Sequence, residues 1–332
     1  MTGWREAGAG LAALTLVGLG AAPAAAEPPP VPSTRLFSFQ GADVVESSGL
    51  VDRGDVVYTN NDSGDAAIVY GVDAATGNTI SRTRYAPSVT DVEALAPGAR
   101  GSLWAGDIGD NLQRRKDVAV YRLTPLDGDH PAVRYTLTYP DGPHNAETLL
   151  VRPHKKKRIL IVTKSAFGGT VYAVPRHLRP GTHRNRMHAI AEVRGLITDG
   201  TFFPDGKHVL LRTYTSASVY TFPAFGLVGT VRLPPQPQGE GISVGQDGRV
   251  LVSSEGVHSD VLQVDLPAAL TSPSARAVSG PLALPRSTRA AAAGTHTAPP
   301  GRNAADWAGI VLVAAVIAGA GYLTMRSARV GP

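Results

Sequence analysis

The sequence predicts an all-β fold, a five-bladed β-propeller. Over residues 27–270, short runs rich in Val, Ile, Tyr and Thr alternate with turn sequences such as Asp-Gly, and no amphipathic helical pattern is present. Aligned on itself, this stretch contains five units that each open with an acid followed by apolar residues. The acids are Glu46, Glu93, Glu147, Asp199 and Glu240. Their spacings of 47, 54, 52 and 41 residues match the roughly 40–50 residues of a four-stranded blade.

The other strands of each unit follow at regular positions. Second strands are predicted over residues 55–62, 102–109, 158–165, 208–215 and 249–256. Third strands are predicted over 67–73, 118–124, 170–175, 218–223 and 261–267, and fourth strands over 79–86, 133–140, 187–194 and 227–234. The fifth unit has no fourth strand of its own, so we expect Thr34–Gln40 to complete it and close the ring, which removes the open sheet edge. A sixth blade would form if residues 274–284 and this N-terminal strand paired separately.

The first 26 residues are typical of a secretory signal peptide. Arg5 supplies the positive charge, residues 9–22 are apolar, and Ala24-Ala25-Ala26 offers a cleavage site for signal peptidase. A buried N-terminal helix is the alternative. We therefore expect the propeller, residues 27–270, to be exported.

Residues 307–325 contain no charge and are predicted to form a transmembrane helix. At about 1.5 Å per residue they would span roughly 28 Å, close to the bilayer core of about 30 Å. Trp307 and Tyr322 sit near the ends of this segment, as interfacial anchors do, and Arg326 and Arg329 follow it. The sequence therefore predicts a single-pass protein of the cell membrane with its propeller outside the cell.

Two further segments complete this arrangement. Residues 271–306 are rich in Pro, Ala, Ser and Thr and are predicted to be a stalk, and residues 326–332 a cytoplasmic tail. The competing interpretation is a sortase sorting signal, which would need LPxTG directly before the apolar segment. Residues 284–288 read LPRST instead and lie well upstream, so a plain membrane anchor is favoured.

The formal net charge of +5 does not come from the propeller segment. Residues 27–270 contain 25 Lys or Arg and 25 Asp or Glu, so the excess positive charge lies outside them. Because binding to phosphates needs a net basic folded surface, nucleic acid is not an expected partner. The absence of Cys excludes disulfides, a thiolate-bound zinc ion and a thiol nucleophile.

The five opening acids are expected to form a ring, because the first strand of each propeller blade lines the central tunnel. Carboxylates that converge there repel one another and need a counter-charge. A hard cation would supply it, and the flexible oxygen coordination of Ca²⁺ suits the ring better than Mg²⁺. The predicted metal ligands are Glu46, Glu93, Glu147, Asp199 and Glu240. In the alternative, each acid accepts backbone N–H bonds at a strand start and water fills the tunnel.

The ends of the second strands should reach the same tunnel mouth. The residues expected there as ligand-binding groups are Asn61, Asp62, Asp107, Asp110, Asn111, Lys164, Arg212, Tyr214 and Glu255. Acids and amides on one side and two exposed cations on the other would bind a small anionic ligand beside a metal ion. The alternative is a set of ordinary turn residues and solvated tips.

The sequence resembles exported bacterial propellers of the gluconolactonase-like and phytase-like groups in its acid-led inner strands and its turns, NNDSG (60–64), GDIGDN (106–111) and FFPDGKH (202–208). This resemblance implies Ca²⁺ in or near the central channel and, in some members, hydrolase activity. Two functions follow as hypotheses. The first is a surface-anchored binding or scaffold propeller that recognises a small ligand or a surface partner. The second is a Ca²⁺-dependent hydrolase of a phosphoester or lactone, with Glu93 or Glu147 as general base.

Overall fold

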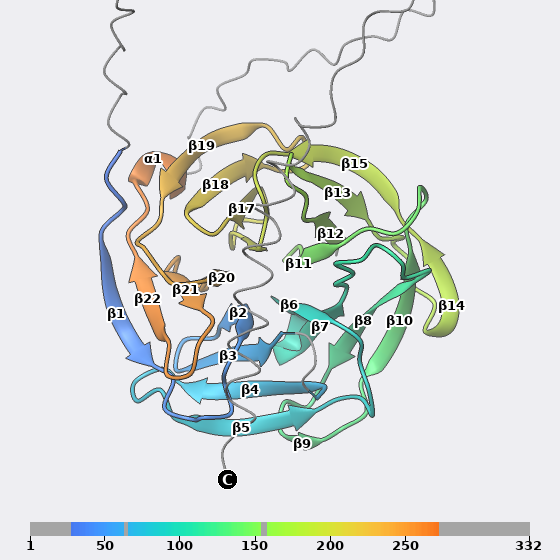
Figure 1. Ribbon diagram of the computed structural model, residues 1–332, viewed down its shortest axis with the longest axis horizontal. Coiled ribbons are helices and arrows are strands. Elements are labelled where there is room, and N and C mark those ends of the chain that lie inside the picture. Colours follow the sequence, from blue (N-terminus) through green and yellow to red (C-terminus); the bar gives the residue numbers. More distant parts are fainter. Residues whose placement is uncertain (1–27, 63–65, 154–157, 272–332) are drawn as a thin grey trace, which may run out of the picture. The chain divides into compact units, whose positions relative to one another are not determined.

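Five mainly antiparallel sheets surround a central axis, so the predicted five-bladed propeller is confirmed (Figure 1). The computed structural model describes residues 28–62, 66–153 and 158–271. Within each blade, the strand that opens the sequence unit lies nearest the axis, and the later strands follow outward.

Each blade is built from four strands, which follow one another from the axis outward. Blade 1 contains β2 (Ser47–Asp52), β3 (Val56–Asn61), β4 (Ile68–Asp73) and β5 (Thr79–Arg84). Blade 2 contains β6 (Val92–Pro97), β7 (Leu103–Asp107), β8 (Val118–Leu123) and β10 (Val133–Thr138). Blade 3 contains β11 (Ala146–Val151), β12 (Ile159–Thr163), β13 (Gly169–Ala173) and β15 (His188–Val193). Blade 4 contains β16 (Asp199–Phe202), β17 (His208–Arg212), β18 (Ser216–Thr221) and β19 (Leu227–Arg232). Blade 5 contains β20 (Gly239–Val244), β21 (Val250–Ser254), β22 (Asp260–Val264) and β1 (Ser33–Ser38).

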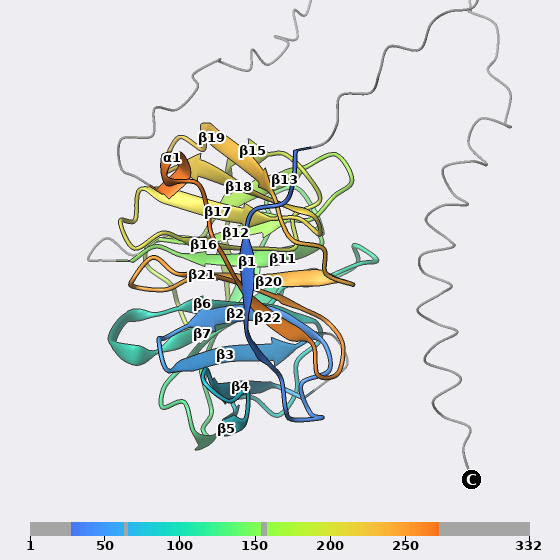
Figure 2. The same cartoon turned by 90° about the vertical axis from the view of Figure 1, so that its left-hand side faces the viewer.

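The N-terminal strand β1 closes the ring as predicted. It pairs antiparallel with β22, with Arg35 opposite Leu262, and both strands face the viewer in Figure 2. Ser38 Oγ adds a hydrogen bond of 2.6 Å to Asp260 Oδ1. The sixth-blade alternative is wrong for this strand, because β1 belongs to the fifth sheet, and residues 274–284 lie outside the described residues.

Two edge strands were not predicted. β9 (Gly128–Asp129) pairs parallel with β5, and β14 (Gly181–Arg186) pairs parallel with β10. Each comes from a loop of the following blade, so each ties a blade to its predecessor. The residues of β14, GTHRNR, have no apolar alternation, which is why the pattern of the sequence did not reveal it.

Apolar side chains pack between neighbouring blades. Among the described residues the core forms five clusters, each joining two adjacent blades. In the cluster between blades 2 and 3, Trp104, Leu149 and Tyr172 are buried. Each blade is therefore packed against a neighbour on both sides, which holds the ends of its inner strand in place.

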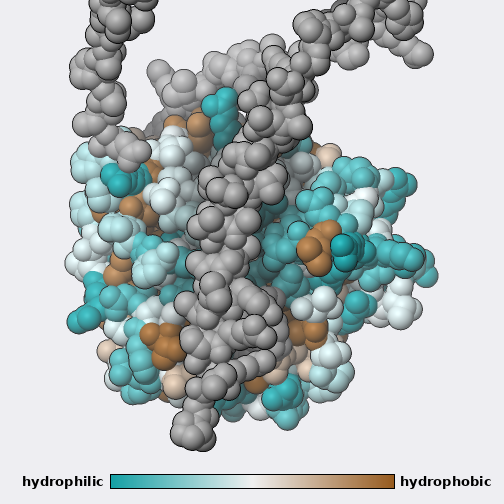
Figure 3. All heavy atoms as spheres, viewed as in Figure 1, coloured by the Kyte–Doolittle hydropathy of each residue, from teal (hydrophilic) through white to brown (hydrophobic). Residues whose placement is uncertain are grey.

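The described part of one face is mostly hydrophilic, with apolar residues scattered singly (Figure 3).

The predicted signal peptide (1–26), the transmembrane helix (307–325), the tail (326–332) and nearly all of the stalk lie outside the described residues. The described part of the chain has no helix long and apolar enough to cross a bilayer. It ends in α1 (Ala268–Thr271), a single short helix.

Candidate functional site

Four of the five predicted acids meet at one end of the axis. Glu93, Glu147 and Glu240 are the second residues of β6, β11 and β20, and in each case the preceding residue pairs with the last residue of the second strand. Asp199, the first residue of β16, differs from them, because it pairs directly with Arg212 at the end of β17 and its Oδ2 accepts a hydrogen bond of 2.8 Å from the backbone N–H of Ile242. All four side chains are buried. We call this end, where the inner strands begin, the acid end.

The fifth acid, Glu46, is displaced from the ring. Because Ser47 pairs with Asn61, the first-blade residue equivalent to Glu93 is Ser48. Ser48 Oγ donates a hydrogen bond of 2.7 Å to the backbone carbonyl of Glu93. Glu46 lies two residues earlier, before β2, and is only half-buried. The predicted ring of five acids is therefore corrected to four acids and one serine.

Lys164 supplies a positive charge inside the acid end. Its Nζ lies 2.6 Å from Glu147 Oε2, donates a hydrogen bond of 2.8 Å to Tyr214 Oη, and lies 5.0 Å from the centre of that ring. Burial lowers the pKa of Lys164, but the charges of Glu147 and Glu240 raise it above its usual value. Burial raises the pKa of Tyr214 to about 12. Lys164 is therefore a fixed counter-charge of Glu147, not the exposed tip that was expected.

Arg212 is completely buried at the end of β17. It donates hydrogen bonds to Gly241 O (2.7 Å), Ser253 O (2.9 Å) and Gln236 Oε1 (2.7 Å). Burial lowers the pKa of Arg212 to about 10, and the charges of Glu240 and Asp199 oppose this shift. The expectation of an exposed cation at the mouth is wrong for Arg212, because its donors are used within the protein.

The carboxylates of Asp62, Asp91 and Glu93 form the tightest acidic group. Asp62 follows β3, Asp91 directly precedes β6, and one carboxylate oxygen from each lies within 4.8 Å of the others. Burial raises the pKa of Glu93 well above its usual value, and the charges of Glu147, Asp62 and Asp91 raise it further. The sequence interpretation did not include Asp91. Its signal was the Asp-Val-Glu pattern at the start of the inner strand, which places two acids on the same side of the strand.

Gly109 has no side chain, which leaves space for the carboxylates of Asp91 and Glu93. A Cβ added at this position would lie 2.3 Å from Asp91 Oδ2 and 2.6 Å from Glu93 Oε1. The backbone N–H of Gly109 also donates to Asp91 O at 3.1 Å. The end of the Gly-Asp-Ile-Gly segment (106–109), just after β7, therefore fits directly against two of the three acids.

Three residues predicted as ligand-binding groups have structural partners instead. Asn61 accepts hydrogen bonds from the backbone N–H groups of residues 45 and 46 through Oδ1. Asp107 forms an ion pair of 2.8 Å with Arg115. Asp110 accepts the backbone N–H groups of Arg114 and Arg115, which orders the loop after β7.

The remaining predicted residues lie at the acid end. Asn111 Oδ1 accepts a hydrogen bond of 2.9 Å from Asn145, whose amide also donates to Glu147 Oε1 at 3.4 Å. Burial raises the pKa of Glu255 to about 7, helped by the charges of Glu240 and Asp62. Burial also raises the pKa of Glu240, which Lys164 and Arg212 partly offset. The acid end thus has Lys164 and Arg212 on blades 3 and 4, Arg115 paired with Asp107 on blade 2, and its tightest acid group between blades 1 and 2.

No family model matches this chain, and no curated protein matches it. One similar solved structure is a Thermus thermophilus protein assigned as an oxidoreductase (glucose dehydrogenase). The two chains are 10% identical, with a TM-score of 0.43, over 71% of this chain and 100% of the other. A similarity of this size gives no information on ligand or reaction. The resemblance to gluconolactonase-like and phytase-like propellers stays a prediction.

Proposed function

We propose that this protein is a cation-binding propeller, with Ca²⁺ held by Asp62, Asp91 and Glu93 at the acid end. The observation that supports this most directly is the approach of three carboxylates to within 4.8 Å. Burial and the charges of Glu147, Asp62 and Asp91 all raise the pKa of Glu93. Ionising Glu93 therefore costs free energy unless a positive charge binds beside it.

The donor set of these residues fits Ca²⁺. Carboxylate oxygens are its preferred protein ligands, and three carboxylates supply three to six of the roughly six to eight oxygens that it takes. Mg²⁺ needs a near-ideal octahedron at about 2.0–2.1 Å, which a group of acids from different strand ends is less able to form. The proposed site differs from the expected central ring, because Lys164 already neutralises Glu147 on the neighbouring blade 3.

We further propose that the acid end binds a small anionic ligand between this cation and Lys164. The side chain of Lys164 retains some exposure, with 15% of it accessible, whereas Arg212 is completely buried and Arg115 is paired with Asp107. A charge-assisted contact from Lys164 would add to the attraction of a bound cation. In this proposal the propeller is exported and attached to the cell membrane through residues 307–325, and its role is binding or scaffolding.

A second candidate function is hydrolysis of a phosphoester or lactone. Glu147, Lys164 and Tyr214 form a chain of hydrogen bonds of 2.6 and 2.8 Å next to the proposed cation site. Burial raises the pKa of Glu147 to about 8, against the opposing charge of Lys164, so this side chain can hold or release a proton near neutral pH. This geometry favours Glu147 over Glu93 as general base, since Glu93 belongs to the acid group that would bind the cation.

Calorimetric titration of the chelator-treated full-length protein with CaCl₂ tests the first proposal. We expect binding, and we expect Asp91→Asn to weaken it by about tenfold or more, equivalent to about 1.4 kcal/mol. Asp127→Asn, which removes an exposed acid outside the acid end, is the matched control and should leave the affinity unchanged. Absence of Ca²⁺ binding, or equal affinity in Asp91→Asn, would overturn the proposed site.

The same protein, assayed on chromogenic phosphoesters and lactones with Ca²⁺ and with chelator, tests the second candidate. Activity that requires Ca²⁺ and is lost in Glu147→Gln would establish the hydrolase. Ca²⁺ binding without turnover of any of these substrates would contradict the hydrolase and support the binding role.

A further inference from the structure

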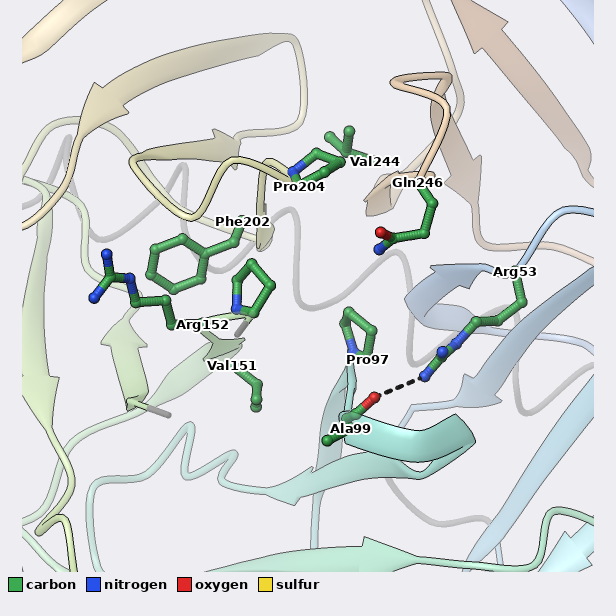
Figure 4. Close-up of a pocket in the computed structure, with 11 residues that line it drawn as sticks. Arg53, Pro97, Ala99, Val151, Arg152, Phe202, Pro204, Val244 and Gln246 are labelled. Atoms are coloured by element: carbon green, nitrogen blue, oxygen red, sulfur yellow. Dashed lines mark hydrogen bonds between the residues drawn. The ribbon is translucent and has the colours of Figure 1, made fainter. Parts of the chain in front are cut away.

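The end of the axis opposite the acid end contains a pocket of about 310 Å³ (Figure 4). Its walls come from the places where inner strands finish. Pro97, Val151, Phe202 and Val244 are the last residues of β6, β11, β16 and β20. Glu93 and Pro97 are four residues apart on β6, which at about 3.3 Å per residue separates this pocket from the acid group by roughly 13 Å. The pocket is therefore a second site, independent of the proposed cation site.

The lining of the pocket is mainly apolar and stiff. Three prolines, Pro97, Pro153 and Pro204, contribute to it together with Phe202. Small-molecule sites are typically concavities of about 300–1,000 Å³ with an apolar lining and a few placed polar groups, so this volume suits a small organic molecule. Proline side chains have little freedom to lose when a ligand binds.

The charge of the lining is opposite to that of the acid end. Its charged residues are Arg53 and Arg152, and none of the described residues that line it is acidic. Arg152 is anchored on one side, since its Nε donates to Gly206 O at 2.8 Å and its guanidinium lies 4.9 Å from the centre of the Phe222 ring. In Figure 4 its guanidinium is turned away from the middle of the pocket. Arg53 is consequently the better candidate for a ligand contact.

Arg53 is held in place, but its charge has no acidic partner. Its Nη2 donates to Gly98 O at 3.2 Å and to Ser102 O at 2.9 Å, while its Nε is buried without a hydrogen-bond partner. Within the described ranges, no carboxylate lies within ion-pair distance of this guanidinium, whereas the nearby Arg249 forms an ion pair of 2.6 Å with Asp52. Burial lowers the pKa of Arg53, which reflects the cost of this partly desolvated charge. An anion in the pocket would compensate that charge.

Gln246 adds a second polar group. It extends from blade 5 toward the pocket on the same side as Arg53, and both face the apolar wall formed by Pro97 and Phe202 (Figure 4). Its amide offers two N–H donors in a pocket that also contains a guanidinium whose orientation is fixed by two backbone carbonyls. Two kinds of donor therefore approach one apolar cavity.

We propose that this pocket binds a small organic carboxylate with an apolar body, aromatic or branched aliphatic. The carboxylate would accept hydrogen bonds from Arg53 and Gln246, and the body would pack against Pro97, Phe202 and Val244. Both N–H groups of Arg53 Nη2 are donated to Gly98 O and Ser102 O, so the carboxylate would accept a hydrogen bond from Nη1, and a single guanidinium is matched in charge by a monoanion. The apolar wall provides no polar partner for the further oxygens of a free phosphate.

The test uses benzoate as the probe, with benzamide as its neutral counterpart, titrated into the full-length protein in the presence of chelator. We expect benzoate to bind and benzamide to bind at least about tenfold more weakly, because it lacks the charge. Arg53→Gln should weaken benzoate binding by about tenfold or more. Arg122→Gln, a matched change of an exposed arginine on β8, should have no effect.

Arg53 also donates hydrogen bonds to Gly98 O and Ser102 O on either side of η1 (Ala99–Gly101), so its substitution can affect folding. A second variant, at Gln246, separates ligand binding from such an effect. Gln246 is exposed, and Gln246→Leu should weaken benzoate binding while the melting temperature stays unchanged. Equal binding of benzamide, unchanged benzoate binding in both variants, or binding of inorganic phosphate alone would overturn the proposal. So would failure of benzoate, phenylacetate and isovalerate to bind. Because chelator is present throughout, none of these outcomes bears on the proposed cation site.

Discussion

Lys164 of blade 3 and Glu147 of the same blade form an ion pair with an Nζ to Oε2 distance of 2.6 Å beside the central axis. This pair divides the acid end into two sides. On one side Lys164 and Arg212 compensate the neighbouring acids, and on the other Asp62, Asp91 and Glu93 approach one another. A bound cation is therefore expected on the second side only, and this asymmetry can be tested by substitution.

We expect Ca²⁺ to stabilise the protein through Glu93 and not through Glu147. At a hundredfold excess over its dissociation constant, a ligand of the native state adds about 2.7 kcal/mol, which corresponds to roughly 5–10 °C in melting temperature. Glu93→Gln should reduce this Ca²⁺-dependent shift, whereas Glu147→Gln should leave most of it. Thermal unfolding of both variants with CaCl₂ and with chelator measures the difference, and an equal loss in the two variants would contradict it.

The stability of the cation-free protein should fall as the pH rises from about 4.5 to 8. Burial raises the pKa of Glu147 to about 8 and that of Glu255 to about 7, and the pKa of Glu93 and of Glu240 also lies above its usual value. In this window the unfolded chain has released protons that the folded protein still binds, so stability is highest at the acidic end. Ca²⁺ should weaken this pH dependence because it replaces the protons at Glu93. Urea unfolding at several pH values, with and without CaCl₂, measures the free energy of unfolding. A free energy that stays constant or increases with pH in the cation-free protein would contradict the prediction.

Arg212→Ala should destabilise the fold strongly. The substitution leaves the carbonyls of Gly241 and Ser253 without their donor in a buried place, and each buried unsatisfied group costs about 1–3 kcal/mol. It also removes a positive charge that lowers the pKa of the buried Asp199. Urea unfolding should show a loss of about 3 kcal/mol or more, against about 0.5 kcal/mol or less for Arg122→Ala at an exposed site. Equal stability of the two variants would show that Arg212 is dispensable for folding.

Phe37→Ala should loosen the closure of the ring. Phe37 lies on β1 and is buried in the cluster between blades 5 and 1, where removing a buried Phe costs about 3–5 kcal/mol. Hydrogen exchange should accelerate first in the amides of β1 and β22. A variant of an exposed outer-strand residue, Ile80→Ala, serves as the control. Uniform acceleration of hydrogen exchange over all five blades would contradict the prediction, because the pairing of β1 with β22 would then be no weaker than the rest of the ring.

The predicted membrane anchor has a direct test in intact cells. Protease added from outside should cut the stalk, residues 271–306, and release the propeller, while a tag placed after Pro332 should stay protected. Propeller recovered in the cytosol would contradict both the signal peptide and the anchor.

The sequence predicted the blades because each blade repeats a local pattern. Second-strand runs such as SLWAGDIG at 102–109 and the acid that opens each inner strand are visible without any knowledge of distant contacts. The closing strand β1 could also be predicted, since a ring with one missing strand requires it. The edge strands β9 and β14 could not, because their pairing depends on where a loop of the next blade comes to lie.

The site was predicted less well than the fold, for two physical reasons. Glu46 is displaced because it lies too early relative to its inner strand. Leu50 and Leu95 are equivalent residues of the first two blades, and Glu46 precedes Leu50 by four residues whereas Glu93 precedes Leu95 by two. A shift of two residues along an inner strand changes which side chain reaches the acid end. The buried states of Lys164 and Arg212 depend on neighbours from other strands and blades, such as Gly241 and Ser253, which no local pattern identifies.

The pairing of β1 with β22 also sets the order of assembly. Ser38 and Asp260 are 222 positions apart, so β1, which precedes the other strands of the propeller, has no partner until the last blade has been made. Its edge stays open during synthesis of the other blades, which is when intermolecular pairing is most dangerous. Ring closure is then the slow, late step, because it joins the two most distant parts of the propeller. A circularly permuted gene that begins just after β1 would place β22 and β1 next to each other in the chain and turn that late step into the folding of a local hairpin.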